Sequence, residues 1–132
     1  MHTTTTTIPA LLIPADLNLP MRTVEIPNSI DCLFTVSHMI GCTFVTRTDV
    51  SPEVHRAIGM PTDMWVDDCG LMVANPKLNL RAALLTGQNL YGDAILTGST
   101  GEDIVALAFK GCAKDFLDLV QRQAEKISKI SA

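Results

Sequence analysis

The sequence has few of the groups on which catalysis and membrane insertion depend. Only 18% of the residues are charged and 5% are aromatic, with one tryptophan and one tyrosine in 132 residues. No apolar run approaches the ~20 residues that cross a bilayer, and no HExxH, GxGxxG or P-loop pattern occurs. The three histidines are isolated from one another and have no acidic partner at ligand spacing. We therefore expect no catalytic group, no metal, no cofactor and no membrane association.

The sequence also lacks a secretory signal and any cysteine pattern typical of a metal or disulfide site. Its four cysteines have neither CxxC nor Cys/His spacing, and residues 1–7 have no basic n-region. We expect reduced thiols in a cytosolic protein, mostly buried as small hydrophobes, with zinc or a redox pair as alternatives. The five consecutive threonines in residues 1–7 predict a disordered tail, or else an extension of the first strand.

What the chain does have is a surplus of apolar residues. Hydrophobic residues make up 47% of the sequence and its mean hydropathy is +0.26, which places it on the apolar side for a chain that forms one domain of this size. A subunit interface would cover such a surplus, so we expect a homo-oligomer. The formal charge of -4 would repel a polyanion, and we therefore expect no duplex nucleic acid as a partner.

Proline, glycine and capping residues divide the chain into alternating strands and helices. The pattern predicts an α+β fold: a small mixed, mostly antiparallel sheet packed with two core helices, plus a C-terminal amphipathic helix. We expect a single domain over 8–132, with that helix over about 113–129. The predicted strands cover 8–14, 21–26, 43–48, 94–97 and 103–108, and the other predicted helices cover about 28–40, 51–58 and 76–86.

Three local features carry more specific expectations. Residues 64–74 predict a hairpin that turns at Asp68 to Gly70. The helix over 28–40, capped by Asn28 or Ser29, should bury an apolar face, and the helix over 51–58 resembles a lid or an insertion. The helix over 76–86 should be capped by Asn75 and end at Gly87. The predicted apolar face of the 28–40 helix consists of Ile30, Leu33, Phe34 and Met39.

The candidate ligand-binding residues are Arg47, Trp65, Asn79 and Arg81. An arginine and an aromatic ring on rigid elements can hold a nucleotide-like ligand through phosphate contact and base stacking. At 100° per residue, Asn79 and Arg81 fall on opposite shoulders of the 76–86 helix and should border the core without entering it. The alternatives are a solvated Arg81, a Trp65 that belongs to the core, and an Asn79 that makes a structural hydrogen bond to a neighbouring strand; for Asn79 the structural role is slightly favoured.

The order of several short segments resembles a family of small proteins called domain of unknown function 3846, whose members are common in bacteriophages. The resemblance covers about Ala10 to Gly98. The segments are "ALLIPAD", "VEI", "MIGCTFV", "MWVDDCGLM", "NLRAALL" and "GDAILTG". Matching positions include Ile40, Gly41 and Phe44 at the end of a helix, Asp67, Asp68 and Gly70 in an acidic turn, Asn79 with Ala82, and Gly92 to Leu96; Cys42 replaces a second glycine of the family pattern.

This resemblance implies a virus-encoded accessory protein that acts in the host cytoplasm, and it implies no reaction. Our first hypothesis is a non-enzymatic counter-defence protein that forms an oligomer and sequesters a nucleotide-like signalling molecule at a subunit interface. The alternative is a protein-binding inhibitor of a host defence or housekeeping factor, docked through the C-terminal helix or a strand edge. An enzyme such as a nucleotide hydrolase ranks third.

Overall fold

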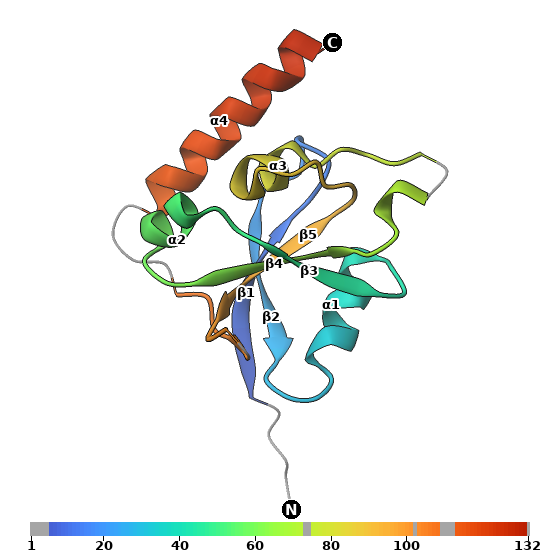
Figure 1. Ribbon diagram of the computed structural model, residues 1–132, viewed down its shortest axis with the longest axis vertical. Helices are drawn as coiled ribbons and strands as arrows, with labels where there is room; N and C mark the ends of the chain where they lie inside the picture. The colour runs from blue at the N-terminus through green and yellow to red at the C-terminus, as the bar shows by residue number, and fades with distance from the viewer. Residues whose placement is uncertain (1–5, 73–74, 102, 109–112, 132) are drawn as a thin grey trace, which may run out of the picture.

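The structure, a computed structural model, describes residues 6–72, 75–101, 103–108 and 113–131. Within these residues the chain forms six strands and four α-helices, the α+β class expected from the sequence (Figure 1). The elements are β1 (Thr7–Ile13), β2 (Arg22–Pro27), α1 (Cys32–Ile40), β3 (Val45–Asp49), α2 (Pro52–Ile58), β4 (Thr62–Asp67), a 3₁₀ turn η1 (Gly70–Met72), α3 (Leu80–Thr86), β5 (Ala94–Ser99), β6 (Ile104–Val105) and α4 (Ala113–Ser131).

The strands form one sheet in the order β2-β1-β5-β4-β3, with β6 paired to β5. Each pairing between these strands is antiparallel, so this part of the chain contains none of the parallel pairs that a mixed sheet would have. Strand β2 pairs with β1, and the chain returns after β5 as β6, where Ser99 pairs with Ile104. The edges of this sheet are β2 and β3.

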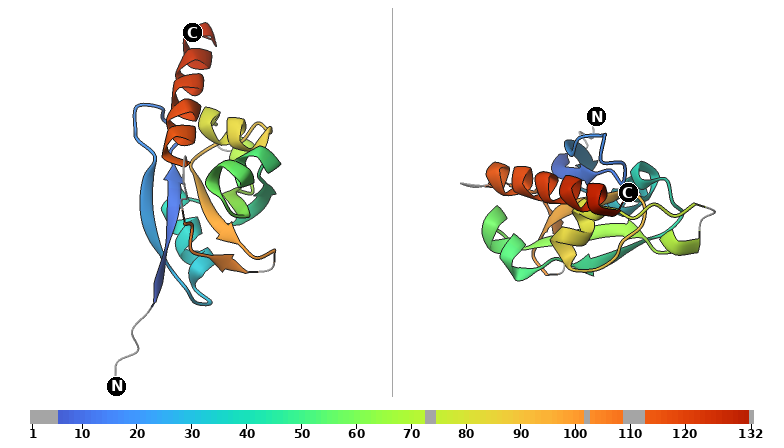
Figure 2. Two further views of the ribbon diagram at one scale, coloured as in Figure 1. Left: turned by 90° about the vertical axis from the view of Figure 1, so that its left-hand side faces the viewer. Right: turned by 90° about the horizontal axis from the view of Figure 1, so that it is seen from above.

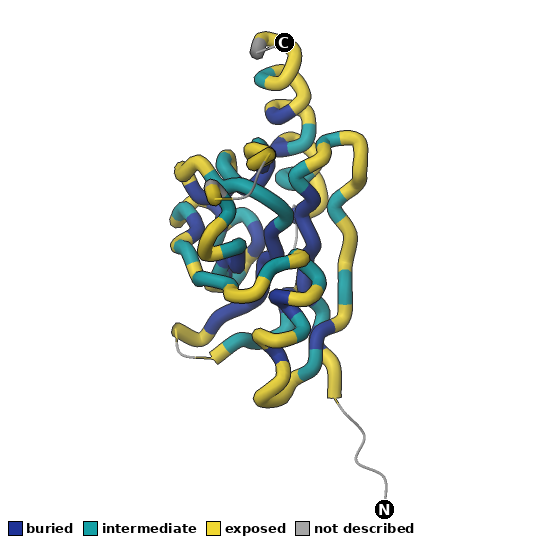
Figure 3. The backbone as a smooth tube through the Cα atoms, turned by 90° about the vertical axis from the view of Figure 1, so that its right-hand side faces the viewer, coloured by how far each residue is buried: buried dark blue, intermediate teal, exposed yellow. Residues whose placement is uncertain are grey.

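Side chains alternate between the two faces of the sheet, and each face carries its own core. On β4, Met64 and Val66 face the core that α2, α3 and α4 cover, whereas Trp65 faces the core that α1 covers. Helix α4 lies beside α3 and extends beyond the other elements (Figures 1 and 2). Burial is concentrated in the central strands, and the last turns of α4 are mostly exposed (Figure 3).

Helix α3 begins later than the sequence predicts, at Leu80 rather than at residue 76. Asn79, not Asn75, is the N-cap, and its Oδ1 accepts a hydrogen bond from the Ala82 N–H at 3.0 Å. Just before the cap, Leu78 forms a bridge with Tyr91. This pairing holds the preceding residues extended, so the proline that suggested a helix start stands outside the helix. The end of the helix at Gly87 is as predicted.

The apolar face predicted for α1 is largely wrong: of its four residues, Met39 packs against the sheet core, whereas Ile30, Leu33 and Phe34 are exposed. The helix begins at Cys32, with Asp31 at the N-cap in place of Asn28 or Ser29, and it buries Cys32 and Val36 against the sheet. At 100° per residue, Phe34 lies on the opposite side of the helix from Cys32. Its side chain is 75% exposed, and Ile30, just before the helix, is 97% exposed. The outer surface of α1 therefore carries large apolar side chains.

The predicted hairpin is wrong, and of the two alternatives for residues 51–58 the lid is wrong, whereas the insertion stays a prediction. After β4 the chain turns into η1 instead of returning as a hairpin, and β4 pairs with β3 and β5; residues 73–74 of the predicted hairpin lie outside the described residues. The segment over 51–58 is not a lid, because Val54 and Ile58 of α2 are buried in the core shared with α3 and α4. Both outcomes were decided by pairing and packing partners that lie far away in the sequence.

The N-terminal strand begins inside the predicted tail, and the cysteines are less buried than expected. Residues 1–5 of the predicted tail lie outside the described residues, whereas Thr7 belongs to β1. Cys32 is buried, Cys42 is half-buried and Cys69 is exposed, so the expectation of buried thiols holds for only one of them; Cys112 lies outside the described residues. Among the helices that the structure describes, none combines the length and the apolar character needed to span a membrane.

Candidate ligand-binding site

Two of the four predicted site residues, Arg47 and Trp65, lie side by side. Arg47 on β3 is directly opposite Trp65 on β4 in the antiparallel register, and such cross-strand partners have their side chains on the same face of the sheet. That face is the one covered by α1. The pairing places a cation next to an indole ring on two hydrogen-bonded strands.

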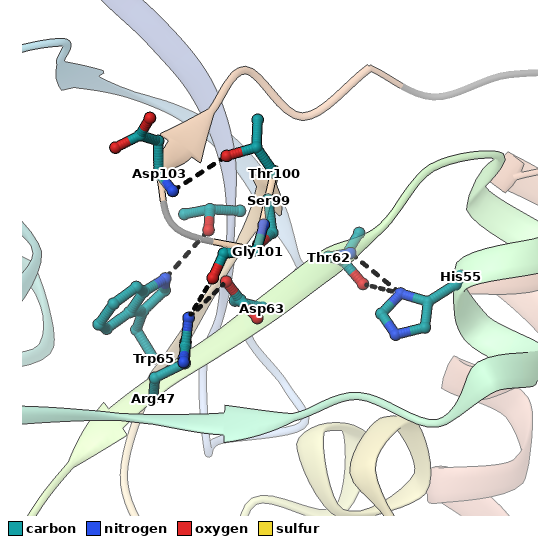
Figure 4. A network of polar contacts seen from close by, with 10 residues as sticks. Arg47, His55, Thr62, Asp63, Trp65, Ser99, Thr100, Gly101 and Asp103 are labelled. Carbon is teal, nitrogen blue, oxygen red and sulfur yellow. Dashed lines mark hydrogen bonds and ion pairs between the residues drawn. The ribbon is translucent and has the colours of Figure 1, made fainter.

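Trp65 is held rigidly in this position. Its side chain belongs to the α1 core and is 9% exposed, and its Nε1–H donates to Oγ1 of Thr97 on β5 at 3.0 Å (Figure 4). Because the only polar atom of the indole is satisfied, the ring is an apolar surface with a fixed orientation. The prediction that Trp65 belongs to the core and the prediction that it faces a site are therefore compatible.

A cleft of about 490 Å³ lies against this pair, between the segment that leads into α1, strands β3 and β4, and strand β6. Trp65 and Arg47 line it together with two carboxylates, Asp63 and Asp103, and with Ile30 and Leu33 at the α1 side. The size is in the range of pockets that hold small organic molecules. The cleft is thus the place where the sequence-predicted residues and a suitable cavity coincide.

The charges in the cleft are mixed and loosely paired. Arg47 Nη1 lies 3.8 Å from Asp63 Oδ2 and donates to the Gly101 carbonyl at 3.3 Å. The Arg47 side chain is 48% exposed, whereas that of Asp63 is 13% exposed (Figure 4). Asp103 also lines the cleft, so among its described lining residues the carboxylates outnumber the guanidinium. Such a cleft suits a ligand with hydrogen-bond donors better than a polyanion.

Sequence reasoning missed Asp63 and Asp103. Asp63 precedes Trp65 by two residues on one strand, so an alternating pattern places both side chains on the same face. Starting the strand at residue 62 rather than at residue 65 would have identified it. Asp103 follows a hairpin loop, and only the tertiary structure brings it to the cleft.

Asn79, the third predicted residue, is fully buried and structural. It caps α3, and its Nδ2 donates to the carbonyls of Ile13 at 2.9 Å and Gly92 at 3.0 Å. One side chain thereby joins α3, the end of β1 and the turn before β5. The expectation that Asn79 borders the core without entering it is wrong, because the residue is part of the interior.

Arg81, the fourth predicted residue, is fully buried as well, on the face of the sheet opposite the cleft. Its guanidinium donates to the backbone carbonyls that follow β1 and to Gln121 of α4, whose Oε1 lies 2.9 Å from Nη1. Burial lowers the pKa of Arg81, and the nearby carboxylates of Asp16 and Asp93 partly oppose this effect. The backbone acceptors are Pro14, Asp16 and Leu19. Arg81 therefore joins the loop after β1 to α4. It is neither solvated nor part of the lining of the cleft.

Residues from the family-like segments meet at another end of the sheet, around a smaller hollow of about 250 Å³. Here Oδ1 of Asp93 accepts a hydrogen bond from Ala15 N–H, and Oδ1 of Asp67 accepts one from Cys69 N–H, both at 2.9 Å. The Gly92 carbonyl accepts from Asn79. The Asp93 contact joins two loops that are far apart in the sequence, and the Asp67 contact stabilises the turn in which it lies, so the acidic turn and the Gly-Asp segment have a structural role.

Cys32 and Cys42 have no features of activated nucleophiles. Burial raises the pKa of Cys32, and burial followed by the charges of Asp67 and Cys69 raises the pKa of Cys42. A thiol that resists ionisation is a weak nucleophile and a weak metal ligand. In the part of the chain that the structure describes, no three His, Cys, Asp or Glu side chains are placed to hold a metal ion.

Comparisons with known proteins support the fold only. No protein-family model and no curated protein matches this chain. Among solved structures, the chain is similar to "Crystal structure of small RNA methyltransferase HEN1", with a TM-score of 0.66 and 15% sequence identity. The match covers 88% of this chain but only 16% of that chain. At this identity the likeness concerns the arrangement of the backbone.

Proposed function

We propose that the protein is a non-enzymatic binding protein that holds a small nucleotide-like ligand in the Arg47–Trp65 cleft. The observation that carries this proposal is the pairing of Arg47 with Trp65 on the wall of a cavity of about 490 Å³. A fixed aromatic ring next to one positively charged and one negatively charged hydrogen-bonding group is typical of a small-molecule site. Together with the family resemblance, it favours a phage-type counter-defence protein that sequesters a signalling molecule in the host cytoplasm.

The rim of the cleft supports a role for a second copy. Ile30 and Leu33 line the cleft and are both exposed, so its opening is bordered by apolar side chains that favour burial. A second subunit that covers this rim would close the cleft over a ligand. This proposal places the site at an oligomer interface, in keeping with the apolar composition of the chain.

The first experiment is a ligand screen by thermal unfolding with cyclic nucleotides and ADP-ribose derivatives. A ligand at about 100 times its dissociation constant adds about 2.7 kcal/mol to the free energy of unfolding, which for a domain of this size raises Tm by roughly 8–10 °C. Arg47→Ala should reduce that rise. The matched control Arg22→Ala, on the opposite edge strand, should not, because Arg22 is exposed and lies away from the cleft.

Recovery of the bound compound intact by chromatography tests the non-enzymatic part of the proposal. If no member of the panel changes Tm, or if Arg22→Ala and Arg47→Ala weaken the response equally, the proposed site is wrong. A chemically altered product would instead indicate an enzyme.

A protein-binding inhibitor is the second candidate, and the exposed outer surface of α1 favours it. Phe34 and Ile30 present large apolar side chains to solvent, an arrangement typical of contact surfaces. The C-terminal helix is less suited to this role than the sequence suggests, because Val120 and Ala124 of α4 are buried within the chain.

Light scattering coupled to size exclusion separates the two candidates. Under the first, the wild type is an oligomer and Phe34→Ser shifts it toward the monomer. Under the second, the wild type is a monomer whose α1 surface is free for another protein. Leu84→Ser, an exposed leucine on α3, serves as the control for solubility effects.

A further inference from the structure

The Asp63 carboxylate has unused capacity to accept hydrogen bonds. Its side chain is 13% exposed, and within the described part of the chain it accepts no hydrogen bond; its polar contact is the 3.8 Å approach of Arg47 Nη1. A carboxylate on a side chain that is mostly covered is stabilised by hydrogen-bond donors. Because Asp63 lines the cleft, a ligand there can supply them.

Arg47 offers the complementary groups beside it. A guanidinium has five N–H donors, and among the described residues the polar contacts of Arg47 are the 3.3 Å bond to Gly101 and the long approach to Asp63. Asp63 and Trp65 lie on the same face of β4, and Arg47 is opposite Trp65. The cleft therefore presents a donor group and a carboxylate next to each other beside an indole ring (Figure 4).

A planar ligand that fits this arrangement carries an acceptor and two adjacent donors along one edge. The edge of guanine has this pattern: a ring carbonyl that can accept from Arg47, followed by a ring N–H and an exocyclic amino group that can donate to both oxygens of Asp63. Adenine presents an amino donor toward Arg47 and a ring acceptor toward Asp63, so both contacts would be unfavourable.

The charge balance decides which part of the ligand is recognised. Asp63 and Asp103 together outweigh Arg47 in the cleft, and carboxylates repel phosphate groups at short range. The phosphate contact that the sequence suggested for Arg47 is therefore less favourable than contact with a neutral base. We propose that the cleft recognises the guanine edge of a small ligand, with Asp63 and Arg47 reading that edge beside Trp65. This inference rests on the proposed binding function.

Titration of the intact protein with guanosine, inosine and adenosine tests the inference. Calorimetry measures affinity, and the emission of Trp65, the single tryptophan, reports binding near the cleft. Inosine lacks the exocyclic amino group and so loses one hydrogen bond to a charged acceptor. We expect it to bind about tenfold or more weakly than guanosine, and adenosine to bind more weakly still.

Asp63→Asn is nearly isosteric, removes the negative charge and replaces one acceptor oxygen by an amide donor. It should reduce the preference for guanosine over inosine to about twofold or less, whereas the matched control Asp115→Asn on exposed α4 should leave the preference intact. If adenosine binds as tightly as guanosine, or if Asp63→Asn leaves the preference unchanged, the guanine assignment is overturned while the binding function stands. If none of the nucleosides and none of the nucleotides of the first screen binds, both fail.

Discussion

Replacement of Arg81 by methionine tests the central structural conclusion, that this arginine fastens the interior and does not serve the site. Methionine retains an unbranched side chain of similar reach but removes every donated hydrogen bond. Three backbone carbonyls and one amide oxygen would lose their donor: those of Pro14, Asp16, Leu19 and Gln121. The change therefore releases the loop after β1 from α3 and α4.

The expected magnitude follows from two opposing contributions. Removing one partner from a buried charged network costs about 3–5 kcal/mol, because acceptors stay buried without donors. Against this, the variant no longer buries a guanidinium, whose desolvation is evident in the lowered pKa of Arg81. Because the loop carbonyls can reach water by local opening, we expect a net loss of about 3 kcal/mol, which corresponds to a fall in Tm of roughly 10 °C.

Urea unfolding followed by Trp65 emission and by circular dichroism measures this loss. Arg56→Met is the matched control, because Arg56 is exposed and makes a surface ion pair of 3.7 Å with Glu53, and such pairs contribute a few tenths of a kcal/mol. Arg81→Lys should fall between wild type and Arg81→Met, since an ammonium keeps the charge but lacks the planar fork. A loss below about 1 kcal/mol for Arg81→Met would refute the reasoning.

Three further predictions concern the interior. Asn79→Asp keeps the cap acceptor of α3 but turns a carboxylate toward the Ile13 carbonyl. We expect urea unfolding to show that the free energy of unfolding falls by about 3 kcal/mol, and a near-neutral result would contradict the buried hydrogen bonds. Gly98→Ala would place a Cβ 2.6 Å from the Ala106 carbonyl oxygen, so a Tm decrease equivalent to about 1–3 kcal/mol is expected, and an unchanged Tm would show that the hairpin opens freely. Burial raises the pKa of the Cys32 thiol above its usual 9.0. The thiol therefore ionises at lower pH in the unfolded chain than in the folded protein, and the free energy of unfolding falls as pH rises past about 9. Cys32→Ala should flatten this decline between pH 8 and 10, and an unaltered decline would argue against a buried thiol.

Much of the fold could be predicted from local signals. Gly41, Gly59 and Gly87 each end a helix in the left-handed conformation, which glycine adopts without steric cost. The alternation in β2 and β3 likewise indicated strands. Such signals act within a few residues, so they survive without knowledge of the rest of the molecule.

The errors arose where a distant partner was decisive. The side of α1 that faces the sheet depends on where the helix starts, and a start about two residues later turns Phe34 outward. The chain after β4 does not form a hairpin, because the ladder positions of β4 are occupied by β3 and β5. Neither partner can be identified from the local pattern.

The candidate site, like the fold, could be predicted from the sequence only in part. The residue types at Arg47 and Trp65 suggested a ligand, and the strands that carry them could be predicted, but their register and the α1 cover that create the cleft could not. Asn79 and Arg81 have polar side chains, so periodicity assigned them to the border of the core. Only the tertiary structure supplied the carbonyls that let them be buried.

By itself, the sequence determined the α+β class, the helix ends and two residues of the cleft, because caps, glycines and alternation act through neighbouring atoms. The tertiary structure decided which polar residues are interior and which line the cleft. The physical reason is that a buried polar group is stabilised mainly by partners from elsewhere in the chain. The two terminal nitrogens of Arg81 find four such acceptors, although its Nε finds none among the described residues, whereas Asp63 lines the cleft and accepts no hydrogen bond within the described residues.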